Sequence, residues 1–217
     1  MSSLMPLELV HKVDHLLLEP QLSRLDVEAG CQIAAQLDCY AVVVKPHYVE
    51  LARKVLKDTR VKVVSVVGFP HGGVTTATKM FETQDVLQRG ADEVEMVINL
   101  GALRDGEDLV VKNDIVSVVK VARGHPITVI LETCFLTDEE QARGCKIAEA
   151  ASVAFIKAAT GFGARGANFA DVQAIRAAAP GVPVKAAGDI STKHAAMELI
   201  EAGAVRIATR FTAQIAA

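Results

Sequence analysis

The sequence predicts an α/β fold, a (β/α)8 TIM barrel, and three observations lead to it. Short β-branched runs alternate with longer segments of helical period along the 217 residues. Eight strand candidates can be counted, the number that closes a barrel of this type. Several helix exits resemble one another, because RGADEVEM, EAASVAFI and EAGAVRIA each lead from a helix end into a strand. Such repeated strand–helix units indicate a parallel sheet.

The expected elements follow these runs in order. Strands are expected at residues 13–16, 41–45, 61–68, 92–98, 127–132, 153–158, 182–187 and 205–209. Helices are expected near 24–38, 48–58, 75–89, 107–123, 138–151, 168–179 and 191–202, with short extra helices at ELVHKV and FTAQIAA. No linker interrupts the pattern, so a single domain over 1–217 is expected. An open doubly wound sheet would show the same alternation, and the sequence leaves that alternative open.

Composition limits the class of protein. Apolar residues make up 51% of the chain and charged residues 23%, as in a soluble globular protein. No apolar run approaches a membrane span, and the start of the chain lacks the pattern of a signal peptide. A net charge of −3 without a basic cluster argues against a nucleic-acid partner. The four cysteines form no zinc pattern, so we expect free thiols, no metal, no cofactor and a cytoplasmic setting.

Three strands carry a charge where a parallel sheet should be apolar: Glu95, Lys157 and Lys185. Each alternates with apolar neighbours, as Lys157 does with Ile156 and Ala158. If the apolar faces meet the outer helices, all three charges point into the barrel, near the carboxyl ends of its strands. Barrel enzymes carry out their chemistry at that end.

These residue types suit Schiff-base chemistry. A single lysine at a strand end reaches solvent about as often as it serves a function. Two lysines on consecutive strands at one depth are harder to explain in that way, because burying like charges together is unfavourable. A second ammonium favours the neutral, nucleophilic form of a nearby lysine, and a carboxylate can move protons as a carbinolamine loses water. We therefore expect Lys157 as nucleophile, Lys185 as its perturbing charge and Glu95 as the proton-transfer group.

The same residues lie in stretches that resemble one family in order and spacing. These stretches are VDHLLLEP, VVSVVGFPHG, ADEVEMVINLGAL, ILETCFLTDEE, FIKAATGFG and VKAAGDIST. They resemble deoxyribose-phosphate aldolase from about residue 10 to 210. The resemblance implies a TIM barrel that cleaves 2-deoxyribose 5-phosphate reversibly to acetaldehyde and glyceraldehyde 3-phosphate without a metal. It also implies small aldehydes as partners and a homodimer as one state of assembly.

The resemblance also implies roles for individual residues. Lys157 falls on the Schiff-base lysine and Lys185 on the second lysine, which perturbs the first. Glu95 falls where the family has an aspartate for proton transfer, and Asp14 matches a position near the substrate. Departures occur beside them: Glu95 is one methylene longer than aspartate, and Leu16 replaces a threonine.

The largest departures from the family fall on its phosphate site. The family's Gly-Gly after the strand of the second lysine is Gly188-Asp189 here, and its GTSS is ATRF at 208–211. Asp189 would repel a phosphate dianion unless Arg210 neutralises it. The two are expected either to pair and fill the pocket, or to leave Arg210 free to bind an anion from a new direction. The acceptor is therefore expected to differ from glyceraldehyde 3-phosphate.

A glycine-rich segment, Gly161 to Gly166, matches the G-x-G-x-x-G pattern of dinucleotide-binding proteins. The following helix is expected to begin only near Asn168, a suitable N-cap, so the glycines form a loop and not the tight turn that a dinucleotide needs. Thr160 and Gly161 are instead expected among the substrate-binding residues, where backbone N–H groups can approach an anionic substrate.

Two further expectations concern single residues. Glu132 ends its strand with inward parity and is expected to help position Lys157 or Lys185 within the substrate site. Lys79 and Glu82 have the spacing of an exposed helical pair. The alternative function is a barrel paralogue that binds a ligand without aldol turnover, although unused buried lysines would destabilise such a protein.

Overall fold

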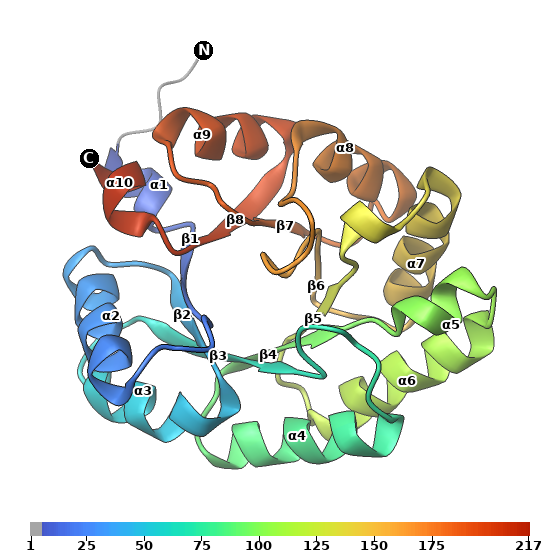
Figure 1. The fold of residues 1–217 in the computed structure, drawn as a ribbon, viewed down its shortest axis with the longest axis horizontal. Helices are drawn as coiled ribbons and strands as arrows, with labels where there is room; N and C mark the ends of the chain where they lie inside the picture. Colours follow the sequence, from blue (N-terminus) through green and yellow to red (C-terminus); the bar gives the residue numbers. More distant parts are fainter. Residues whose placement is uncertain (1–5) are drawn as a thin grey trace.

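A closed barrel of eight parallel strands, each followed by helix, forms the centre of the chain (Figure 1). This computed structural model describes residues 6–217; the predictions that cover the first five residues lie outside the described part. The strands follow chain order around the barrel, and β8 pairs with β1. They are β1 (Val13–Leu17), β2 (Ala41–Val44), β3 (Lys62–Val67), β4 (Glu93–Val97), β5 (Ile127–Ile130), β6 (Phe155–Lys157), β7 (Val184–Ala187) and β8 (Ala204–Thr209). The predicted barrel is confirmed, and the open doubly wound sheet is not formed.

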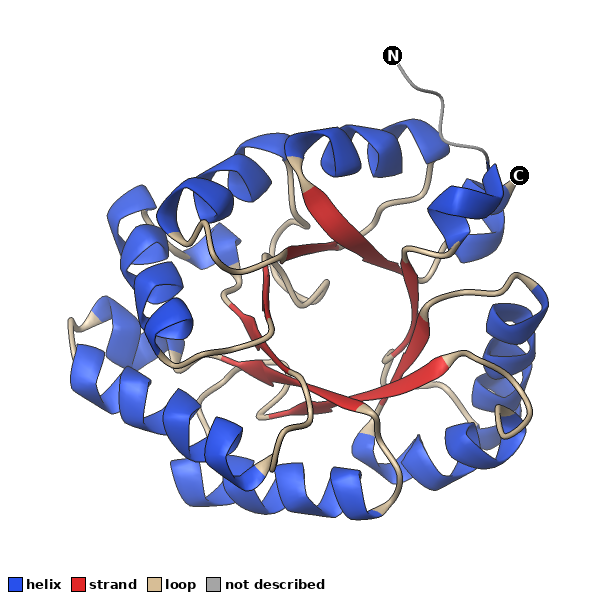
Figure 2. Cartoon of the chain, turned by 180° about the vertical axis from the view of Figure 1, so that it is seen from behind, coloured by secondary structure: helices blue, strands red, loops and turns tan. Residues whose placement is uncertain are grey.

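The helices form a ring outside the strands, seen from the other side in Figure 2. They are α1 (Pro6–Val10), α2 (Arg24–Gln36), α3 (Val49–Val55), α4 (Thr76–Gln88), α5 (Leu100–Arg104), α6 (Asp108–Val121), α7 (Asp138–Ala150), α8 (Phe169–Ala178), α9 (Lys193–Ala202) and α10 (Thr212–Ala216). Two 3-10 turns, η1 (Pro46–Tyr48) and η2 (Thr133–Phe135), complete the set. α5 and η2 were not predicted, because one turn of helix is too short to show a period. None of the described helices is long and apolar enough to cross a membrane.

The alternation of side chains along the strands separates two cores. Ile156 and its outward-facing equivalents pack against the helices in one large apolar cluster. A second, smaller cluster lies inside the barrel on the side of β1, β2 and β3, and includes Leu16, Leu18, Val43 and Val66. The inward parity predicted for Lys157 is confirmed, because its side chain is fully buried and bonded across the barrel interior. The barrel interior therefore holds a small apolar cluster as well as buried charged side chains.

The two ends of the described chain pack together at the margin of the barrel, where α1 lies beside α10 (Figure 1). His15 on β1 points to this region, with its Nδ1 2.8 Å from the Thr212 hydroxyl. Burial lowers the pKa of His15 to about 4, so the ring is neutral at physiological pH. His15 therefore has a structural contact outside the barrel interior.

Lys79 and Glu82 do not form the exposed helical pair expected from their spacing. The Lys79 ammonium is fully buried and donates to Asp114 on α6 at 2.5 Å and to the carbonyl oxygen of Val97 at 2.9 Å. Glu82 accepts a hydrogen bond from the Gly68 N–H at 2.7 Å. Spacing within one helix cannot reveal a partner on another, so both contacts were invisible in the sequence. Lys79 thus ties α4 to α6 and β4, and Glu82 ties it to the loop that follows β3.

Candidate active site

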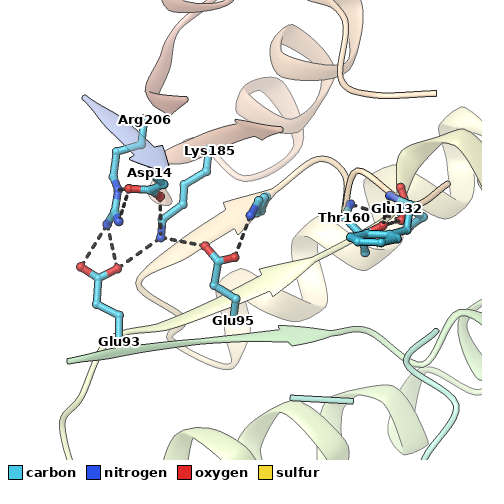
Figure 3. A network of polar contacts seen from close by, with 9 residues as sticks. Asp14, Glu93, Glu95, Glu132, Thr160, Lys185 and Arg206 are labelled. Atoms are coloured by element: carbon cyan, nitrogen blue, oxygen red, sulfur yellow. Dashed lines mark hydrogen bonds and ion pairs between the residues drawn. The ribbon is translucent and has the colours of Figure 1, made fainter. Parts of the chain in front are cut away.

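Lys157, Glu95 and Lys185 meet inside the barrel, as predicted. The Lys157 ammonium donates to one oxygen of Glu95 at 2.7 Å, and Lys185 donates to the other at 3.1 Å. None of the three side chains has any exposed surface. Figure 3 shows Lys185 and Glu95 pointing toward one another, although they lie on β7 and β4, which are not adjacent in the barrel. One carboxylate thus lies between two ammonium groups.

A second layer of charge continues the network and was missed in the sequence. Arg206 on β8 donates to Asp14 at 2.6 Å and to Glu93 at 2.7 Å (Figure 3). Lys185 lies 3.2 Å from Glu93 and 3.7 Å from Asp14. The signal was present, because Glu93 has the parity of Glu95 and Arg206 alternates with apolar neighbours on its strand. The cluster therefore contains three carboxylates and three cations, all nearly or fully buried.

The depth of the cluster differs from the expectation that all three predicted charges lie near the carboxyl ends of the strands. Lys157, the last residue of β6, is the register partner of Lys185, as expected of two lysines at one depth, but Lys185 and Glu95 occupy inner positions of β7 and β4. Arg206 stacks over the ring of Tyr40, which precedes β2, with 3.9 Å to the ring centroid. The network thus runs along the interior from the amino ends of the strands to Lys157. Asp14, expected near the substrate, is a fully buried member of its inner layer.

The charges set the protonation states of their neighbours. Burial alone would raise the pKa of Glu95, but the charges of Lys157 and Lys185 lower it to about 2. Burial alone would lower the pKa of Lys185, but the charges of Glu95 and Asp14 raise it above its ordinary value. At neutral pH Glu95 is therefore a carboxylate and Lys185 an ammonium. Each stabilises the charged form of the other inside the barrel, where both side chains are buried.

Glu132 takes a different role from the one expected. β5 ends two residues before it, and Glu132 adopts a left-handed backbone conformation with φ of 55°. Its carboxylate accepts hydrogen bonds from the Thr160 N–H at 3.2 Å and from the Thr160 hydroxyl (Figure 3). Its direct hydrogen bonds therefore go to the loop after β6, and not to Lys157 or Lys185. Parity could not show this, because the chain leaves the strand before Glu132.

Removing the Glu132 carboxylate should loosen this loop. Glu132→Ala should lower the free energy of unfolding by about 1–3 kcal/mol, because the buried Thr160 donors lose their acceptor. Glu132→Gln keeps an acceptor without the charge. Since burial raises the pKa of Glu132, wild-type stability should fall as pH rises through that folded-state pKa. Urea unfolding across a pH series should show this fall in wild type and not in the glutamine variant; identical profiles would contradict it.

The remaining predicted substrate residues gather in one small cleft at the carboxyl ends of the strands. Its lining comprises Leu16, Leu18, Glu19, Thr160, Gly161, Phe162, Gly188, Asp189 and Arg210, and its volume is about 110 Å³. The Arg210 guanidinium lies 2.9 Å from Asp189 and 3.6 Å from Glu19. Asp189 and Arg210 thus form the expected ion pair, at the solvent-exposed margin of a cleft that stays open.

The glycine-rich segment is a loop, and α8 begins after it with Asn168 as its N-cap, as expected. Asn168 accepts from the Asp171 N–H at 2.9 Å in a capping box. A Cβ on Gly166 would lie 2.8 Å from the Gly188 Cα, so the glycine allows the loops after β6 and β7 to touch. This is a packing role, and it lacks the strand-to-helix turn of a dinucleotide site.

Comparison with known proteins identifies the family. The family described as DeoC/LacD family aldolase matches residues 9–209. The chain belongs to this family of aldolases. A deoxyribose-phosphate aldolase from Thermococcus kodakarensis is 46% identical over 207 residues, which cover 93% of this chain and 92% of the relative. Membership makes the protein a lyase and argues against the alternative of a barrel without turnover.

Solved structures of aldolases share the fold throughout. The aldolase QR15 superposes with a TM-score of 0.93 at 34% identity, covering 96% of this chain and 94% of its own. The deoxyribose phosphate aldolase from Aeropyrum pernix, described as a tetramer, superposes with a TM-score of 0.92 at 27% identity, covering 98% and 91%. The aldolase described here therefore has a fold of the same extent as these proteins.

Proposed function

We propose that this aldolase works through a Schiff base on Lys157, with acetaldehyde or a similar small aldehyde as donor and an aldehyde other than glyceraldehyde 3-phosphate as acceptor. The observation that carries the proposal is the contact of Glu95 with Lys157 at 2.7 Å and with Lys185 at 3.1 Å inside the barrel. A nucleophile, a fixed positive charge and a carboxylate are the groups that a class I aldolase needs.

The reaction follows from the amine. The neutral Nζ of Lys157 attacks the donor carbonyl carbon, and the carbinolamine loses water to leave an iminium. Loss of a proton from the adjacent carbon gives an enamine. The nucleophilic carbon of the enamine forms a bond to the acceptor carbonyl carbon, whose oxygen takes up a proton. Water then adds to the new iminium and releases the 3-hydroxyaldehyde and free Lys157; cleavage is the reverse sequence.

Glu95 and Lys185 act by charge in this scheme. The iminium carries its positive charge where the Lys157 ammonium was, so Glu95 at 2.7 Å stabilises it. Formation of the neutral enamine removes one of the two cations beside Glu95, which makes the carboxylate more basic at the step where a proton is released. Lys185 stays charged, because several carboxylates surround it.

The choice of acceptor rests on the cleft that holds Asp189. The carboxylates of Asp189 and Glu19 place negative charge where a phosphate would approach. Both carboxylates lie within 4 Å of the Arg210 guanidinium, which is therefore already paired. A phosphate dianion would have to displace these partners. The second candidate is deoxyribose 5-phosphate cleavage itself, which is favoured by relatives of that name at 43–46% identity.

Borohydride trapping tests both parts. Acetaldehyde, deoxyribose 5-phosphate and unphosphorylated deoxyribose are offered separately, and the reduced adduct is located by peptide mass spectrometry. We expect an adduct on Lys157 with acetaldehyde, and no advantage of the phosphorylated sugar over deoxyribose in kcat/KM. Adducts on other lysines only would reject the Schiff-base assignment. Efficient cleavage of deoxyribose 5-phosphate would reject the acceptor assignment and establish the second candidate.

We further propose a homodimer in a cytoplasmic setting. Three of the four cysteines are buried free thiols, and burial raises the pKa of Cys31 and Cys145 to about 12. Such thiols are poorly reactive, which suits a reducing compartment. Sedimentation of the purified protein measures the state of assembly.

A further inference from the structure

A second, larger cleft opens at the carboxyl ends of β1, β2 and β3. Its volume is about 360 Å³, within the range of pockets that hold small molecules. Its lining comprises Leu18, Pro20, Lys45, Pro46, Val66, Gly68, Phe69, Pro70, Glu82 and Phe162. Most of these side chains are apolar, and Phe69 packs edge to face on Phe162 with 5.4 Å between ring centroids.

The two charges of this cleft are already bonded within the protein. The Lys45 ammonium donates to the carbonyl oxygens of Glu19 at 2.8 Å and Pro20 at 3.2 Å. Glu82 accepts from the Gly68 N–H at 2.7 Å. Both charges are held by backbone groups of the protein, and the rest of the lining is apolar, so the cleft favours an uncharged, apolar group.

The cleft leads toward the reacting lysine. Val66, in its floor, is the register partner of Glu95 on the adjacent strand, and Glu95 bonds Lys157. Leu18 and Phe162 form walls of both this cleft and the small cleft of Asp189 and Arg210. Since Lys157 is fully buried, a carbonyl compound reaches it only when side chains between the clefts and the lysine shift.

We propose that this apolar cleft, the β1–β3 cleft, binds the hydrocarbon tail of an unphosphorylated acceptor aldehyde while its carbonyl group faces the enamine on Lys157. The inference rests on the proposed function and names the substrate class for it. The small cleft is crossed by the ion pair of Asp189 and Arg210 and offers about 110 Å³, less than a third of the other. The acceptor tail therefore extends into the adjacent, larger cleft, over Val66.

A chain-length series measures this preference. With acetaldehyde as donor, kcat/KM is determined for propanal, butanal, pentanal and hexanal, with products identified by mass. Each methylene buried in the cleft should raise kcat/KM roughly three- to fourfold. Glyceraldehyde 3-phosphate should be a poorer acceptor than hexanal. A flat or falling series would overturn the proposal.

Matched variants locate the effect. Val66→Thr places a hydroxyl in the floor of the cleft at nearly constant volume and should lower the ratio of kcat/KM for hexanal over propanal about fivefold. Val64→Thr makes the same change two residues earlier on the same strand, inside the barrel but outside the cleft lining, and should leave that ratio unchanged. Equal ratios in both variants and wild type would place the tail elsewhere.

Acetaldehyde trapping and the chain-length series together distinguish failure of the apolar cleft from failure of the Schiff-base mechanism. Trapping of acetaldehyde on Lys157 involves no acceptor, so it should succeed in wild type and in both valine variants. A normal adduct with no chain-length dependence would reject the apolar cleft and leave the Schiff-base mechanism standing. The absence of an adduct in wild type would reject the mechanism, and with it this use of the cleft.

Discussion

Replacing Lys157 with alanine should reduce aldol turnover by at least about 10⁴-fold, because it removes the amine proposed to form the Schiff base; losses of this order follow removal of a nucleophile that acts within a catalytic unit. The variant should fold. Glu95 keeps the Lys185 ammonium at 3.1 Å after the change, although the cluster is left with one excess negative charge, so some loss of stability is expected. Initial rates with purified variants, and circular dichroism to confirm the fold, measure both expectations.

A control distinguishes loss of this lysine from loss of any lysine. Lys112 is exposed on α6, outside the barrel interior, and Lys112→Ala should keep wild-type turnover. With acetaldehyde and borohydride, Lys112→Ala should still carry a reduced adduct on Lys157. The Lys157→Ala variant should carry none. Turnover of Lys157→Ala within tenfold of wild type would place the chemistry on another residue.

The second large effect is expected from the inner layer of the network. Arg206→Met removes the cation between Asp14 and Glu93 and should lower the free energy of unfolding by about 3–5 kcal/mol, since it leaves buried charge uncompensated. Glu93→Gln in the same chain removes one of the two carboxylates at nearly constant volume. The double variant should therefore be less destabilised than Arg206→Met alone, as urea unfolding of the three proteins will show.

The same variants should move the pH dependence of turnover in opposite directions. The six charges of the network sum to zero when all are ionised, from three cations and three carboxylates. Arg206→Met leaves one excess negative charge, which favours the ammonium form of a lysine and should shift the acid side of the rate profile to higher pH. Glu93→Gln should shift it to lower pH, and the double variant should return it toward wild type. If both single variants shift the acid side of the rate profile in the same direction, Arg206 and Glu93 act through folding alone.

The positions of the predicted site residues show what alternation along a strand can and cannot reveal. Lys157, Lys185 and Glu95 were placed inside the barrel because each interrupts an apolar strand with the right parity, and the structure confirms their direction. Glu132 obeyed the same parity, but the chain turns into η2 before its side chain can face the lysines. Parity holds only while the backbone remains extended.

Partners across the barrel were beyond the reach of the sequence. Glu93 and Arg206 lie on β4 and β8 and are separated by 113 residues, yet their side chains are in contact. Lys79 meets Asp114 across two helices in the same manner. In each case a charged side chain can be buried because its partner neutralises it. The partner lies on a distant segment, so neither segment alone predicts the burial. The pairing of Asp189 with Arg210 was expected only because the family resemblance placed both beside one ligand site.

The sequence by itself determined the alternation of strands and helices, the count of eight strands and the inward direction of Lys157 and Lys185, because these depend on local period and parity. Only the tertiary structure decided which charges neutralise one another, how deep the network lies, and that an apolar cleft flanks one side of it. The physical reason is that closing the barrel brings non-adjacent strands face to face across its interior. The energies of buried charges depend on those distances and not on spacing along the chain.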